Sequence, residues 1–312
     1  MRTDRRKYWT LSLVLVLILG PLGRFAHPSS NGKRAKAYRD INAIGHRVIG
    51  YPYGPANWYS LDKEKDIGAQ FSAAFEKSTP LLRDEITQSY LDRVAQTIRQ
   101  NSDSQLPTTV RVIDTEESYA LTLAGGYQYI TRGLLLRLQN EGELAAALAR
   151  GIAHSALRSA TGEATKANLM KAATIPMIGV GHDGLVNSTD PGLTVPLALL
   201  TFRRQDESSA DYFGIQYLYK SGYAPECFIG FVQKAWPPSG EPTAKAFSPF
   251  PPVAERVKTL EREINEILPE RSAAITSTAD FVAFREHLLS LTPPKPSPKM
   301  PTLVRSNPPQ AN

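Results

Sequence analysis

The chain has 312 residues, of which 42% are hydrophobic, so it can bury a sizeable core, and its formal net charge at pH 7 is +6. The basic residues are scattered and form no stripe with interleaved aromatic residues, which argues against a nucleic-acid-binding protein. The single cysteine, Cys227, excludes an internal disulfide framework and a cysteine-rich metal site.

The N-terminus has the pattern of an export signal. A basic segment, residues 2–7, precedes a short apolar run over residues 9–19 and the breaker Gly20-Pro21. The run is shorter than the roughly 20 residues that a membrane-spanning helix needs, and no cleavage site stands out, so a cleaved signal and an uncleaved anchor both stay open. We predict a signal peptide or membrane anchor over residues 1–27. The rest of the protein is expected in the periplasm or cell envelope, with inner-membrane anchoring as the open alternative.

Residues 28–59 are rich in glycine, proline and asparagine, which indicates an extended arm. Ser60 is a suitable N-cap for a helix over residues 61–77, and Pro80 is expected to open a second helix with an apolar face. After that helix, short alternating segments predict a small sheet. Its strands are expected over residues 110–113, 119–123 and 127–131.

A central helix is expected over residues 143–158. Apolar residues recur at helical spacing from Ala145 to Ala156, and no proline interrupts them. Arg150 and His154 are one turn apart, so their side chains share a face.

The rest of the chain is mainly helical, with a proline-rich tail over residues 293–312 that should be disordered. The order of helices, a small sheet and more helices indicates an α+β fold in which helix dominates. The later helices are predicted over residues 132–138, 164–175, 197–219, 225–235, 254–267 and 278–291.

The sequence around His154 resembles the active-site helix of the HtpX-like and CAAX-prenyl-protease-type zinc metallopeptidases, metallopeptidase family forty-eight. In that family the helix carries H-E-x-x-H, in which two histidines bind zinc and the glutamate activates the zinc-bound water. Here the second histidine is His154, whereas Arg150 stands at the first histidine and Gly151 at the glutamate. The resemblance implies a zincin-like (gluzincin) metallopeptidase fold for residues 60–292.

Gly125-Gly126 and the YQYITRGL sequence after them resemble the family's G-G-x-x-x-V-T-x-G-L strand and turn. The resemblance implies that residues 127–131 form an edge strand beside the active-site helix and pair with the substrate backbone. We therefore expect Gly125, Gly126 and Tyr127 to line a peptide groove beside His154.

Further along the chain, the sequence from Glu207 to Asp211 resembles the family's E-x-x-A-D motif. The resemblance places Glu207 at the third zinc ligand and Asp211 at the carboxylate that orients a ligating histidine. Phe250 stands where the family often has a second catalytic histidine, and Arg256 keeps the position of an arginine.

Two hypotheses for the function follow. The first is an exported or anchored pseudopeptidase without a cofactor, which binds or scaffolds polypeptides and keeps His154 and Glu207 as relic ligand positions. The alternative is an active zinc metalloendopeptidase for envelope protein quality control that uses substitute ligands, with His182 as a weak candidate. The first is favoured because Arg150 repels a cation and Gly151 offers no general base.

Arg150 also supplies a specific structural prediction. Its guanidinium is long enough to reach the vacated metal position and can bind carboxylates through paired hydrogen bonds. We expect it to form an ion pair with Glu207, Asp211 or both.

Overall fold

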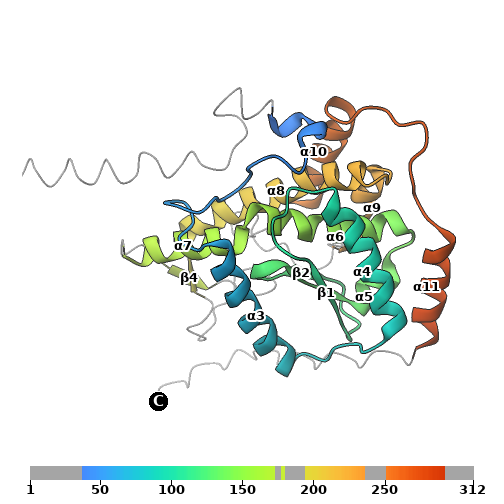
Figure 1. Cartoon of the computed structure of the whole chain (residues 1–312), viewed down its shortest axis with the longest axis horizontal. Helices are drawn as coiled ribbons and strands as arrows, with labels where there is room; N and C mark the ends of the chain where they lie inside the picture. The colour runs from blue at the N-terminus through green and yellow to red at the C-terminus, as the bar shows by residue number, and fades with distance from the viewer. Residues whose placement is uncertain (1–36, 173–176, 180–193, 236–250, 292–312) are drawn as a thin grey trace, which may run out of the picture.

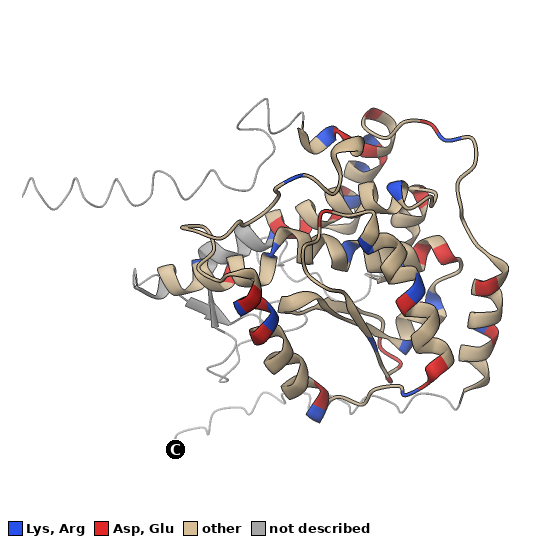
Figure 2. Ribbon diagram, viewed as in Figure 1, with Lys and Arg blue, Asp and Glu red and all other residues tan. Residues whose placement is uncertain are grey.

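The computed structural model describes residues 37–172, 177–179, 194–235 and 251–291. The segment predicted as a signal or anchor and the proline-rich tail lie outside these ranges, as do His182 and Phe250. Within the described ranges, no helix combines the length and the apolar character that crossing a membrane requires. Figure 2 shows basic and acidic residues interspersed along the ribbon, without a continuous basic stripe.

The described chain is dominated by helices, as predicted. Ser60 caps the first long helix by accepting a hydrogen bond from the backbone N–H of Lys63 at 3.1 Å. Pro80 does not open the second one, because Asp84 caps it and the residues between are not helical. The helices are α3 Leu61–Ser78, α4 Glu85–Gln100, α5 Arg132–Arg137, α6 Glu141–Leu157, α7 Ser159–Ala172, α8 Leu197–Lys220, α9 Glu226–Ala235, α10 Val253–Glu266 and α11 Ala279–Ser290.

The main sheet has three strands, β1 Thr109–Ile113, β2 Ala120–Thr122 and β3 Tyr127–Thr131, in the order β1-β3-β2. β3 pairs with β1 in parallel and with β2 in antiparallel, so the prediction that β3 is an edge strand is wrong. Burial on both faces from Gln128 to Thr131 fits a central strand. The edge strands of this sheet are β1 and β2. A separate antiparallel pair joins β4 Met177–Gly179 to β5 Thr194–Pro196.

Helix α6 lies at the centre of the molecule, between the sheet and α8 (Figure 1). Nearly all its residues are buried, including the alanines that line it. Small residues let α8 approach closely, since a Cβ placed on Gly214 of α8 would lie 3.2 Å from the Cα of Arg150. This approach sets the charged residues of the two helices against one another.

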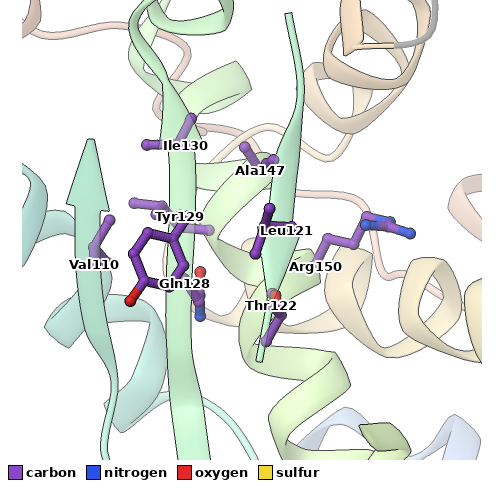
Figure 3. A pocket seen from close by; sticks show the side chains of 11 residues that line it. Val110, Leu121, Thr122, Gln128, Tyr129, Ile130, Ala147 and Arg150 are labelled. Carbon is purple, nitrogen blue, oxygen red and sulfur yellow. The ribbon is translucent and has the colours of Figure 1, made fainter. Parts of the chain in front are cut away.

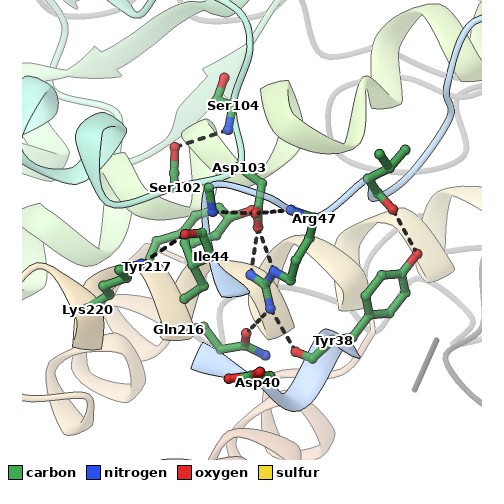
Figure 4. A network of polar contacts seen from close by, with 12 residues as sticks. Tyr38, Asp40, Ile44, Arg47, Ser102, Asp103, Ser104, Gln216, Tyr217 and Lys220 are labelled. Carbon is green, nitrogen blue, oxygen red and sulfur yellow. Dashed lines mark hydrogen bonds and ion pairs between the residues drawn. The ribbon is translucent and has the colours of Figure 1, made fainter. Parts of the chain in front are cut away.

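The segment that precedes α3 is packed against the helices from residue 38 onward (Figure 4). Arg47 donates from Nε to Asp103 Oδ2 at 3.0 Å and from Nη1 to Gln216 Oε1 at 2.8 Å. Tyr217 also donates to Asp103, at 2.8 Å. Tyr51 N–H donates to the carbonyl of Leu157 at the end of α6. The predicted arm therefore contacts α6, α8 and the turn after α4.

Candidate functional site

The site lies between α6 and α8, where two facing helices present opposite charges. Arg150 on α6 pairs through Nη2 with Glu207 Oε2, and its Nε lies 3.3 Å from Asp211 Oδ1. Glu207 and Asp211 are four residues apart, so α8 directs both carboxylates the same way. The predicted ion pair of Arg150 is thus present, and it engages both carboxylates.

Helix α10 contributes a second guanidinium to the same cluster. Arg256 donates from Nε to Asp211 Oδ2 at 2.7 Å and from Nη2 to Oδ1 at 2.9 Å, the bidentate geometry that arginine favours. Two arginines therefore face two carboxylates, and the cluster is balanced in charge. The motif comparison located Arg256 but gave no sign of this contact, because no local pattern links it to Asp211.

His154 lies beside the charged cluster. Its Nε2 is 3.6 Å from Glu207 Oε2, and its Nδ1 is 3.4 Å from Ser159 Oγ. Burial, together with the positive charges of Arg150 and Arg256, holds the pKa of His154 well below its ordinary value. Burial also lowers the pKa of Arg150, to about 10, so at neutral pH the arginine is charged and the imidazole is neutral.

These side chains do not fit a zinc ion. A protein zinc site needs at least three protein ligands, and among the described residues no group of three His, Cys, Asp or Glu side chains converges. His154 and Glu207 supply two donors, and the Glu207 carboxylate already binds a guanidinium. Asp211 is bound by two arginines, not by the imidazole.

The place of a side chain at position 151 is taken by Gln128 of β3. A Cβ built on Gly151 would lie 2.4 Å from Gln128 Oε1 and 2.5 Å from its Cδ. Beside Gln128 is a small cavity of about 10 Å³, the size of one water molecule, between the sheet and α6 (Figure 3). Thr122 of β2 and Arg150 line it as well. Sequence reasoning missed Gln128, which falls at a variable position of the strand motif.

The glycines expected in a groove have another role. Gly125 and Gly126 are buried, and their φ angles of 75° and 87° lie in the left-handed region that glycine tolerates. A Cβ on Gly126 would stand 1.8 Å from the carbonyl oxygen of Pro107. They form the tight turn between β2 and β3 and, like Tyr127, do not line the cavity.

Comparison with known proteins places the site in a family. The family model described as "Peptidase family M48" matches residues 85–264. The chain is 26% identical over 186 residues to the β-barrel assembly-enhancing protease of Yersinia pestis, a match that covers 56% of this chain and 38% of that protein. It is 28% identical over 178 residues to the putative β-barrel assembly-enhancing protease of Vibrio cholerae, covering 53% of this chain and 36% of the relative.

The β-barrel assembly-enhancing protease of Escherichia coli K12 is 25% identical over 186 residues, with 56% of this chain and 38% of the relative covered. The chain thus spans less than two fifths of the length of the curated relatives it matches. The family match, in contrast, extends over more than half of this chain and includes the three-stranded sheet, α6 and α8. The chain belongs to peptidase family M48.

Proposed function

We propose that this protein is a non-catalytic member of the family, a pseudopeptidase with a zincin-type fold that binds polypeptides without cleaving them. The observation that carries the proposal is the Arg150 guanidinium, which bridges α6 and α8 where the family's metal would join them. A buried charge cluster that is already balanced gains nothing from a divalent cation. Gly151 stands at the position of the family's catalytic glutamate, and it has no side chain that could act as the general base in hydrolysis.

The outer edge of β2 is the surface that fits an extended polypeptide. The backbone bonds that join β2 to β3 run from Leu123 N to Tyr127 O and from Thr131 N to Tyr119 O. Antiparallel strands alternate between bonded and non-bonded pairs, so the backbone groups of Ala120 and Thr122 face the outer edge. They are available for β-augmentation by a client strand.

The relatives suggest which clients would use such an edge. They are named for enhancing β-barrel assembly. A barrel protein that has not yet closed carries strands with unpaired edges, and unpaired edges pair readily with another exposed strand. We therefore propose incompletely assembled, strand-rich polypeptides of the cell envelope as clients. A location in the cell envelope agrees with the export pattern at the N-terminus, whether the signal is cleaved or kept as an anchor.

Metal content and hydrolysis, measured on the same purified protein, test the catalytic part of the proposal. We expect less than about a tenth of a zinc equivalent after dialysis, and no casein hydrolysis above background with or without a chelator. Zinc near one equivalent together with chelator-sensitive hydrolysis would overturn the proposal in favour of an active endopeptidase.

Binding is tested by fluorescence anisotropy with a labelled, unfolded outer-membrane protein. Thr122→Pro removes the outward N–H of β2 without removing a bond to β3, and it should abolish most binding. Thr122→Val is the matched control, because it keeps the N–H and should bind far more tightly than Thr122→Pro. Equal binding by all three proteins would exclude the β2 edge as the docking strand.

A further inference from the structure

Gln128 carries an unused hydrogen-bond donor into the site. Its residue is only 4% exposed, and its Nε2 has no hydrogen-bond partner in the part of the chain that the structure describes. A buried amide donor without a partner lowers the free energy of unfolding, so its presence in the fold needs an explanation. The amide borders the cavity between β2 and α6.

The surroundings of that donor specify what it would bind. Thr122 pairs directly with Gln128 across β2 and β3, so both side chains lie on the same face of the sheet. The guanidinium groups of Arg150 and Arg256 are already paired with the carboxylates of Glu207 and Asp211. A neutral acceptor oxygen therefore fits better than a carboxylate. The cavity of about 10 Å³ admits one oxygen-sized group.

A polypeptide paired with the outer edge of β2 would direct alternate side chains to the α6 face, toward this cavity. We propose that Gln128 donates a hydrogen bond from Nε2 to the oxygen of a short polar client side chain, such as that of asparagine, serine or threonine. The inference rests on the proposed binding of a polypeptide strand by β2. Gln128 is then a specificity-determining residue, and it also fills the volume that a side chain at position 151 would need.

An array of peptides based on one extended, strand-forming host sequence tests the specificity. Each position of the host is occupied in turn by asparagine or by its near-isostere leucine. At one position the wild type should bind the asparagine peptide about 3- to 10-fold more tightly, the worth of one neutral hydrogen bond. Gln128→Met keeps the size of the side chain but lacks the donor, so it should lose that preference.

Gln70→Met, an exposed glutamine on α3, is the matched control and should keep the preference. If the wild type binds no peptide, the proposed function fails and this inference fails with it. If the wild type binds but shows no position of preference, or if Gln128→Met keeps the preference, only the inference about Gln128 is overturned.

The volume filled by Gln128 is tested without any peptide. The three atoms nearest to a Cβ on Gly151 all belong to Gln128, at 2.4, 2.5 and 3.0 Å. Gly151→Ala should therefore lower the melting temperature in the wild type. In a Gln128→Ala background the same change should raise it, because alanine is the better helix former. An equal shift of the melting temperature in both backgrounds would overturn the inference that Gln128 fills this volume.

Discussion

Removal of the guanidinium from the site is the most direct perturbation of this fold. Arg150→Ala leaves the carboxylates of Glu207 and Asp211 facing a cavity without their shared cation. The breaking of a buried ion pair by loss of one partner typically costs about 3–5 kcal/mol in unfolding free energy, because the remaining charge is desolvated and uncompensated.

The structure indicates the lower end of that range. Asp211 is 7% exposed but keeps both of its bonds to Arg256. Glu207 loses its guanidinium, yet its side chain is 17% exposed and gains some solvation. We therefore expect Arg150→Ala to cost about 3 kcal/mol. The double variant with Glu207→Gln should recover part of this loss, because the uncompensated charge is then absent.

Urea denaturation followed by circular dichroism measures these changes. Lys65→Ala serves as the control, since it breaks a surface pair with Asp62 whose side chains are 45% and 91% exposed. That variant should lose no more than about 0.5 kcal/mol. A loss below about 1 kcal/mol for Arg150→Ala, or no recovery in the double variant, would refute the reasoning from the buried charge cluster.

Four further predictions concern metal, pH, design and location. A chelator should leave the melting temperature unchanged, and a lowered melting temperature would reveal a bound metal that stabilises the fold. Burial, with the nearby charge of Asp211, raises the pKa of Glu263 from 4.5 to about 8, so the folded protein keeps a proton that the unfolded chain releases. Unfolding free energy should therefore fall as pH rises from 4.5 to 8, by up to about 1.4 kcal/mol per unit, and Glu263→Gln should remove this slope in melts across that range. Arg150→His with Gly151→Glu should bind zinc only when Gln128→Ala makes room for the new side chain; elemental analysis that finds equal zinc in the double and triple variants would contradict this. An alkaline phosphatase fusion after residue 32 should be active, and an inactive fusion would exclude export.

The helices were within reach of sequence reasoning because they depend on local spacing, and the ion pair of Arg150 was within reach because the family resemblance places Arg150, Glu207 and Asp211 at one metal site. Ser60 caps the helix that it was expected to cap. The spacing between Glu207 and Asp211 fixes their common direction on α8, and the Arg150 side chain is long enough to form ion pairs with both.

The order of the strands could not be predicted from the sequence. β3 is the central strand because β1 pairs with it on one side and β2 on the other, and no local pattern specifies the pairing with β1. The positions of Gln128 over Gly151 and of Arg256 on Asp211 are tertiary contacts of the same kind. Such contacts join residues without any periodicity that relates them. The resemblance to a family gave the place of β3 in the motif but not its neighbours.

The network around Arg47 has a consequence for the order of folding. Arg47 bonds Gln216 across 169 positions, and it bonds Asp103 across 56. Closing so long a loop is entropically costly until the intervening segments are compact. During synthesis the segment with Arg47 emerges first, but its α8 partners are made much later. The docking of this segment should thus be a late event, which completes the fold only after α6 and α8 have met.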